Sequence, residues 1–365
     1  MSKIVVFGAT GFTGRLTTEA LLAAGAAPVL AARDATALAK LATELGGADT
    51  AVADVREPTS VRALLGRGDV LVTTVGPFLR YGRPALDAAL AAGAHYLDST
   101  GEGPFIRTVF EHHERARDSG IALLPAFGFD YVPGNLAAAL ALREAPDAVR
   151  ADIGYFLDRP GTSGGTRASI AGMLFEEGFA LRGGRVVAQR SGSRVRAFDV
   201  AGGKRSSVSI PGSEHLVLHR AHPGLREADV YLGLPEVAAR GMQVTSLVAS
   251  AAAGVAPVKR LALGALGRVV KGSTGGPGPR ARARTRSHTV ADVSDADGRL
   301  LASVTLTGGD PYDLTAAMLS WGARTALDGG LRETGALGPV EAFGLDALIA
   351  AAAAAGLTRS EAGAR

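Results

Sequence analysis

The chain has 365 residues, of which 47% are hydrophobic and 20% charged, as is typical of soluble globular domains. A net charge of +4 does not indicate nucleic-acid binding, and no apolar run is long enough to predict an integral membrane segment. The lack of cysteine excludes disulfides and cysteine-ligated metal sites, so we expect a cytoplasmic protein without a secretory signal.

The first third of the chain alternates short apolar runs with helical segments. Strands are expected over residues 3–7, 28–32, 50–53, 69–75, 95–98 and 121–124. Helices are expected over residues 14–24, 34–45, 58–65, 84–92 and 102–119. This alternation predicts an α/β fold with a Rossmann-type, doubly wound parallel sheet, forming a dinucleotide-binding domain over residues 1–132.

After Pro133 the regular alternation ends. Strands are expected near residues 151–158, 185–200, 206–221 and 283–307, and helices near 134–143, 166–181, 311–327 and 341–355. The segment Asp295-Ala-Asp-Gly298 predicts a hairpin turn. We therefore expect a second, mixed α+β domain with a largely antiparallel sheet over 133–330, serving substrate binding and dimerisation. A C-terminal helical segment, 331–365, is expected to pack back on the first domain.

A glycine-rich turn follows the first strand and opens the first helix. In Gly8-Ala-Thr-Gly11-Phe-Thr-Gly14, the glycines permit a tight turn, a close approach to a pyrophosphate and close packing of helix on strand. The helix N-terminus would present N–H groups and a positive dipole end to the phosphates. The residues predicted to bind the cofactor here are Gly8, Thr10, Gly11, Phe12, Thr13 and Gly14.

The ends of the second and third strands bear on the choice of cofactor. Arg33 ends the second strand and is suited to hold a 2′-phosphate and to stack on adenine, which favours NADP(H). Asp34 comes next and is either a ribose ligand or a helix cap. Asp54 follows the third strand and either touches the adenine or caps a helix.

The fourth and sixth strands end in loops that would face the reacting half of the cofactor. Gly76, Pro77 and Phe78 are predicted to line the nicotinamide side. The candidate catalytic residues are Tyr81, Asp130 and Tyr131, with either tyrosine as proton donor and Asp130 orienting it. The alternatives are a lid residue for Tyr81, a turn or cap for Asp130, and water as the proton source. No lysine follows a tyrosine by four positions, which argues against a short-chain dehydrogenase.

Several motifs occur in an order that resembles the saccharopine dehydrogenase-like reductases. They are the glycine turn, VGPFLRYG at 75–82, YLDSTGE at 96–102, PAFGFDYVP at 125–133, GTSGGT at 161–166 and GDPY at 309–312. Within that family the chain looks similar to bacterial trans-acting enoyl reductases. The resemblance implies an NADPH-dependent enzyme that reduces a carbon–carbon double bond on an acyl or polyketide chain.

Other residues leave alternatives open. The segment Ser163, Gly164, Gly165 and Thr166 is predicted to bind the substrate or to cap a helix. A zinc site at His215, His219 and His222 is disfavoured, and no metal is expected. Arg280, Arg282, Arg284 and Arg286 would share one face of a strand, as a dock for an acidic carrier or as a solvated face.

The leading hypothesis is a reductase that transfers hydride from NADPH to an activated C=C bond of a lipophilic or carrier-bound substrate. An imine reductase of the saccharopine dehydrogenase type is the first alternative, with Arg159 and Arg167 as carboxylate ligands. A non-catalytic NADP-binding scaffold is the second. The expected partners are a small or carrier-bound substrate and, from the family resemblance, a second copy in a homodimer.

Overall fold

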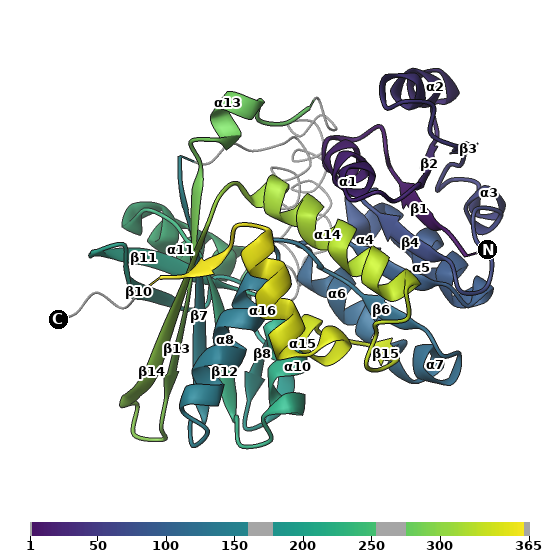
Figure 1. The fold of residues 1–365 in the computed structure, drawn as a ribbon. Helices are drawn as coiled ribbons and strands as arrows, with labels where there is room; N and C mark the ends of the chain where they lie inside the picture. Colours follow the sequence, from purple (N-terminus) through teal and green to yellow (C-terminus); the bar gives the residue numbers. More distant parts are fainter. Residues whose placement is uncertain (1, 160–177, 253–274, 361–365) are drawn as a thin grey trace. The chain divides into compact units, whose positions relative to one another are not determined.

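The computed structural model describes residues 2–159, 178–252 and 275–360 (Figure 1). The chain divides into two compact units, each built from separate stretches of sequence. The first unit comprises Met1–Gly101, Phe105–Val132 and Pro311–Ala355. The second comprises Glu102–Pro104, Pro133–Asp310 and Gly356–Arg365.

The first unit is an α/β layer structure. Its strands are β1 (Ile4–Phe7), β2 (Val29–Ala32), β3 (Thr50–Val52), β4 (Val70–Thr73), β5 (His95–Asp98), β6 (Ala122–Leu124) and β15 (Gly335–Ala336). Its helices are α1 (Phe12–Ala23), α2 (Ala35–Glu44), α3 (Pro58–Arg62), α4 (Phe78–Tyr81), α5 (Arg83–Ala92), most of α6 (Gly103–Phe110), α7 (His113–Asp118), α14 (Pro311–Leu327), α15 (Pro339–Phe343) and α16 (Leu345–Ala354).

The seven strands form one sheet in the order β15-β6-β5-β4-β1-β2-β3, and every pair of neighbours is parallel. This order is that of a doubly wound sheet, and it reverses between β1 and β4. All residues of β1 and β4 are buried, as expected for strands covered on both faces. The predicted Rossmann-type sheet is therefore confirmed.

Helix α14 corrects one predicted boundary. Residues up to 330 were predicted to belong to the second domain, but the chain returns to the first unit at Pro311. Figure 1 shows α14 next to α1, and its buried side is made of small and apolar residues that pack on α1 and on the sheet. Helical periodicity predicted the limits of α14 but not the partner against which its apolar face is buried.

The second unit is built on a mixed sheet. Its strands are β7 (Arg150–Asp158), β8 (Phe179–Arg182), β9 (Arg185–Ala188), β10 (Val195–Val200), β11 (Gly203–Ile210), β12 (Glu227–Gly233), β13 (Arg286–Ser294), β14 (Leu300–Gly308) and β16 (Thr358–Arg359). Its helices are α8 (Val132–Glu144, with Val132 in the first unit), α10 (Glu214–Ala221), α11 (Glu236–Ala252) and α13 (Pro279–Arg282).

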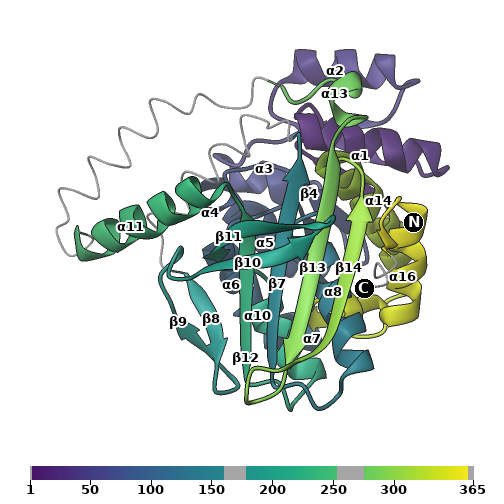
Figure 2. The same cartoon turned by 90° about the vertical axis from the view of Figure 1, so that its left-hand side faces the viewer.

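The main path of this sheet is β10-β11-β12-β7-β13-β14-β16, and β8 joins β12 and β9 at the side. Only the β12–β7 pair is parallel among the described pairs of this unit. Figure 2 shows β7, β13 and β14 as long neighbouring strands. The predicted second domain with a largely antiparallel sheet is confirmed in its class.

Three predictions of secondary structure were wrong in this unit. The predicted strand 206–221 ends at Ile210, because Pro211-Gly212 breaks it and Ser213 begins helix α10. Most of the predicted helix 166–181 lies outside the described residues, but its end belongs to strand β8. The alternating arginines do not share a strand face, since Pro279 starts the short helix α13 and β13 begins only at Arg286.

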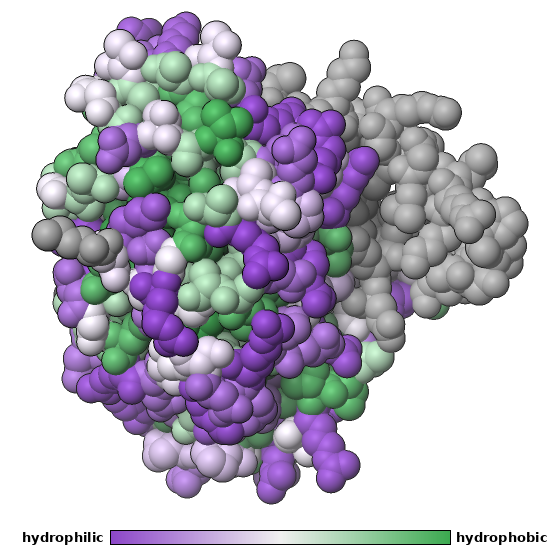
Figure 3. Space-filling model, turned by 90° about the vertical axis from the view of Figure 1, so that its right-hand side faces the viewer, coloured by the Kyte–Doolittle hydropathy of each residue, from purple (hydrophilic) through white to green (hydrophobic). Residues whose placement is uncertain are grey.

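Within the described parts of the chain, no helix is long and apolar enough to cross a membrane. Figure 3 shows one face of the molecule, on which hydrophilic and hydrophobic residues are interspersed.

Candidate functional site

The glycine turn joins β1 to α1 at the point where the strand order of the first sheet reverses. The N–H of Gly8 donates to the carbonyl oxygen of Ala31 in β2 at 2.8 Å, and that of Gly11 donates to Gly8 O at 2.9 Å. Gly11 is the N-terminal cap of α1 and provides no side-chain cap. The first N–H groups of α1 therefore face the carboxyl edge of the sheet, where dinucleotides bind.

The space around the turn tests whether a pyrophosphate backbone site fits. A Cβ atom on Gly14 would lie 2.1 Å from Gly8 O, and one on Gly8 would lie 2.8 Å from the Thr74 hydroxyl oxygen. Gly8 also has a positive φ of 93°, which disfavours other residues. The glycines at both positions are thus required by the close packing of β1, α1 and the loop after β4, and the turn fits the predicted cofactor.

At the end of β2, the structure separates the roles of two neighbouring residues. The Asp34 carboxylate accepts a hydrogen bond from the Ala37 N–H at 2.9 Å and caps α2. Arg33 is exposed and makes no hydrogen bond or ion pair within the described residues. Asp34 is therefore engaged as a helix cap, while the Arg33 guanidinium is available for an anion.

Asp54, after β3, has a partner that the sequence analysis did not consider. Its carboxylate accepts hydrogen bonds from the Arg56 side chain, at 2.7 Å to Nη2, and from the Arg56 main-chain N–H at 2.9 Å. The cap of α3 is Glu57, so Asp54 does not cap that helix. The predicted contact of Asp54 with adenine stays a prediction.

The loop after β4 is anchored in the core. Phe78 is 6% exposed and its ring lies 5.6 Å from that of Phe105. Its side chain therefore holds Gly76 and Pro77 in place, and any contact of Phe78 with a cofactor would involve its main chain. Tyr81, half-buried at the end of α4, lies near enough to Arg56 for electrostatic interaction, with the Arg80 guanidinium 4.9 Å from its ring.

A buried carboxylate, Asp98, ties together the loops that follow β5 and β6. It accepts hydrogen bonds from the N–H groups of Thr100 at 2.9 Å and Ala126 at 2.7 Å, and from the Tyr96 hydroxyl at 2.7 Å. Burial and the neighbouring carboxylate raise the pKa of Tyr96 well above its usual value, so the phenol remains a donor. This role of Asp98 was not predicted from the sequence.

The two loops held by Asp98 carry the remaining candidates. Tyr131 is 1% exposed, and its hydroxyl donates to the carbonyl oxygen of Gly101 at 3.3 Å. A Cβ on Gly101 would lie 2.8 Å from the Asp130 carboxylate, so the glycine gives Asp130 room. Asp130 itself is solvent-exposed, yet the protein packed around it raises the pKa of its carboxyl group to about 6. Asp130 is thus suited to exchange a proton near neutral pH.

Helix α14 supports both sides of the site. The Phe12 ring packs edge-on against Tyr312 with ring centroids 5.1 Å apart. The hydroxyl of Thr315 accepts a hydrogen bond from the Phe129 N–H at 3.0 Å and donates to Pro311 O. Tyr312 and Thr315 lie within one turn of α14, so this helix contacts the glycine turn and the loop after β6 at once.

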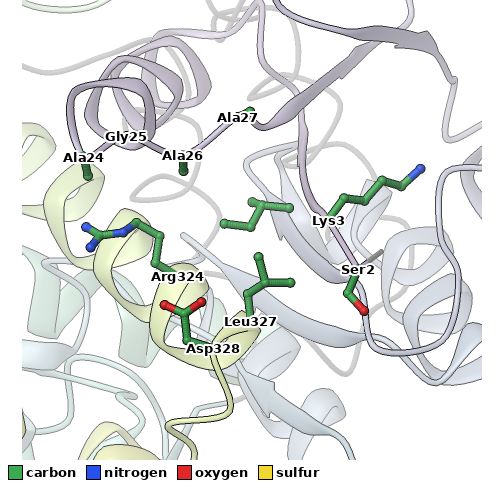
Figure 4. Close-up of a pocket in the computed structure, with 10 residues that line it drawn as sticks. Ser2, Lys3, Ala24, Gly25, Ala26, Ala27, Arg324, Leu327 and Asp328 are labelled. Atoms are coloured by element: carbon green, nitrogen blue, oxygen red, sulfur yellow. The ribbon is translucent and has the colours of Figure 1, made fainter.

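Other predicted residues lie elsewhere. Ser163, Gly164, Gly165 and Thr166, with Arg167, fall outside the described residues, so their role stays a prediction. His215 is buried in helix α10, where the Gly212 N–H donates to its Nδ1 at 3.1 Å. A cavity of about 450 Å³ lies in the first unit, and Lys3, Arg324 and Asp328 are among the residues that line it (Figure 4). It borders the N-terminal end of β1 and is therefore at the opposite edge of the sheet from the glycine turn.

Comparisons with known proteins show what the first unit is similar to. Residues 4–124 match the family model of the saccharopine dehydrogenase NADP-binding domain. A trans-acting enoyl reductase of Mycobacterium leprae is 41% identical over 140 residues, covering 36% of this chain and 34% of that protein. A Mycobacterium tuberculosis protein, provisionally named for the same activity, is 40% identical over 183 residues, covering 47% of this chain and 44% of that protein. The chain thus spans less than half the length of the curated relatives it matches.

The fold also has a counterpart among solved structures. Saccharopine dehydrogenase (L-Glu forming) from Saccharomyces cerevisiae aligns over 99% of both chains with a TM-score of 0.61, at 12% identity. This likeness concerns the fold alone. The matched domain confirms the predicted cofactor, NADP(H). Residues 4–124, which contain the glycine turn and strands β1 to β6, are therefore similar to the NADP-binding domain of saccharopine dehydrogenases.

Proposed function

We propose that the protein is an NADPH-dependent reductase that acts on an activated C=C bond of a lipophilic or carrier-bound acyl substrate. The observation that carries the proposal is the glycine turn, packed as a dinucleotide site within the matched NADP-binding domain. The choice of a C=C bond is supported by the relatives named as trans-acting enoyl reductases. The term trans-acting in those names supports a substrate that is held by a separate protein, and a carrier-bound acyl group is our proposal for it.

When bound, NADPH supplies the hydride. The chain's own residues bind the cofactor, orient the substrate and supply a proton. The glycine turn and the N-terminus of α1 bind the pyrophosphate, and Arg33 binds the 2′-phosphate. Gly76 and Pro77, anchored by Phe78, border the nicotinamide side.

Asp130 is the proposed proton donor. It is exposed, its carboxyl pKa is about 6, and no hydrogen bond of its side chain is found within the described residues. Tyr131 is a less suitable donor, because its hydroxyl already donates to Gly101 O. Tyr131 instead positions the loop, and Tyr81 is the remaining alternative donor.

The first experiment measures NADPH and NADH binding by fluorescence, followed by cofactor oxidation with enoyl, imine and keto-acid substrates. We expect tighter binding of NADPH and turnover with enoyl thioesters. Turnover only with imines would support saccharopine dehydrogenase-type chemistry, and binding without turnover would support a scaffold. An absence of NADPH binding would contradict the proposal.

The pH dependence tests Asp130. A carboxyl group whose pKa is raised to about 6 keeps its proton up to that pH, so kcat/KM should fall as the pH rises above about 6. Asp130→Asn should lower kcat by roughly 100-fold or more and remove this limb, while the Kd of NADPH stays unchanged. A variant with the wild-type pH profile would exclude Asp130 as the donor, and Tyr81→Phe would then be the variant to measure.

A further inference from the structure

Three charged side chains gather at the carboxyl ends of two neighbouring strands in the first unit. Arg33 follows β2, and Asp54 and Arg56 follow β3, which pairs with β2 through Ala32 and Val52. Both guanidinium groups act electrostatically on the Asp54 carboxylate. In a doubly wound sheet, the residue at the end of the second strand contacts the group at the ribose 2′ position. The three charged groups therefore lie at the strand ends next to which NADP and NAD differ.

Asp54 holds Arg56 in a defined geometry. The carboxylate accepts from Nε at 3.2 Å, from Nη2 at 2.7 Å and from the Arg56 N–H at 2.9 Å. The Arg56 side chain is 71% exposed and that of Asp54 only 20%. Hydrogen bonds from Arg56 and the nearby Arg33 charge lower the pKa of Asp54, so its carboxylate stays ionised at neutral pH.

One edge of the Arg56 guanidinium remains available. The edge formed by Nε and Nη2 is used by Asp54, and Nη1 makes no hydrogen bond within the described residues. A guanidinium has five N–H donors in a rigid fork, so one carboxylate does not saturate it. The Arg33 guanidinium and the Nη1 group of Arg56 are therefore the donors that the hydrogen bonds of Asp54 leave for a phosphate dianion, and Glu57 also acts electrostatically on Arg56.

We propose that Arg56, oriented by Asp54, is a second ligand of the 2′-phosphate of NADP(H) together with Arg33. In this arrangement Asp54 positions the Arg56 guanidinium and does not contact the adenine. The inference rests on NADP(H) being the cofactor of the first unit.

The test measures the Kd of NADPH and NADH by fluorescence for the wild type and for Arg56→Ala. We expect the substitution to weaken NADPH binding roughly tenfold or more, as for loss of a charge-assisted bond, and to change NADH binding less than twofold. Arg62→Ala is the matched control, since Arg62 is another exposed arginine, on the adjacent helix α3. Its removal should leave both constants within twofold of the wild type.

Asp54→Asn gives a test of opposite sign. If Asp54 only contributed charge, its neutralisation would strengthen NADPH binding by removing repulsion of the phosphate. If Asp54 orients Arg56, the variant should weaken NADPH binding severalfold. Adding Asp54→Asn to Arg56→Ala should then cause no further loss, because the two residues act through one contact.

Four results would overturn the inference: equal losses for NADPH and NADH in Arg56→Ala, equal losses in Arg62→Ala and Arg56→Ala, unchanged NADPH binding in Arg56→Ala, or tighter NADPH binding in Asp54→Asn. Thermal unfolding of each variant checks that these exposed substitutions leave the fold intact. If the wild type does not bind NADPH, the proposed function is wrong as well. If the wild type binds NADPH and the variants bind it equally well, the proposed function stands and only the assignment of Arg56 is wrong.

Discussion

Two buried carboxylates, one in each unit, are held in different ways. Asp98 in the first unit is 0% exposed and accepts from two main-chain N–H groups and the Tyr96 hydroxyl. Asp229 in the second unit is 1% exposed and accepts from three guanidinium groups. The distances are 2.5 Å to Arg182, 3.1 Å to Arg150 and 2.9 Å to Arg194.

The difference reflects the two kinds of sheet. The parallel sheet of the first unit is covered by helices, so its polar groups gather at strand ends, where loops provide main-chain donors. In the second unit, Arg150 in β7, Arg182 in β8 and Arg194 before β10 converge on β12. The buried charge at the end of β5 is thus satisfied mainly by main-chain N–H groups of two loops, whereas the one in the mixed sheet is satisfied by cations from other strands.

The largest effect is expected for Asp229→Ala. Removing this carboxylate leaves three arginines without their shared partner, and loss of one member of a buried ion pair costs about 3–5 kcal/mol. Because the arginine side chains are 19–41% exposed, we expect about 3 kcal/mol loss in the free energy of unfolding. Denaturant unfolding measures it.

Glu227→Ala is the matched control for that measurement. Glu227 also pairs with Arg150, at 2.7 Å, but its side chain is 40% exposed. Its loss should cost at most about 1 kcal/mol. Equal losses of unfolding free energy for the two substitutions would show that burial does not determine how much each carboxylate contributes to stability.

Asp98→Asn should have a smaller effect. The amide preserves the shape but places an NH₂ group where an oxygen accepts hydrogen bonds, at a cost of about 2 kcal/mol in unfolding free energy. Since Asp98 holds the loop that precedes Asp130, kcat should also fall while NADPH binding persists. A stable variant with unchanged kcat would show that the loops keep their positions without this carboxylate.

The smallest effect is expected for Asp34→Ala. Loss of the α2 cap should cost about 1 kcal/mol, measured by thermal or denaturant unfolding. The Kd values of NADPH and NADH should remain within twofold of the wild type, because Asp34 is engaged by the Ala37 N–H. A selective loss of NADH binding would instead identify Asp34 as a ribose ligand.

Much of the first unit could be predicted from local patterns. The apolar runs of β1 and β4, the three glycines after β1 and the cap at Asp34 each act within a few residues, and the structure places all of them as those patterns indicate. The strand predicted over 206–221 failed because its apolar residues fit a strand or a helix equally well, and the Pro211-Gly212 break was not weighed.

The candidate site was predictable to a similar degree. The glycine turn and the exposed Arg33 follow from sequence position relative to a strand. The two-residue spacing of Asp54 and Arg56 would have allowed their pairing to be predicted. Only an adenine contact and a helix cap were considered for Asp54. The support of Phe12 by Tyr312 joins residues 300 positions apart, and no local pattern predicts such a contact.

The sequence by itself determined the doubly wound sheet, its glycine turn and the preference for NADP(H), because strand burial, turn geometry and helix capping depend on neighbouring residues. Only the tertiary structure decided that α14 belongs to the first unit, that Asp98 joins two loops and that three arginines meet at Asp229. Those features depend on which distant segments bury their apolar faces together, and burial then decides which polar groups must be paired.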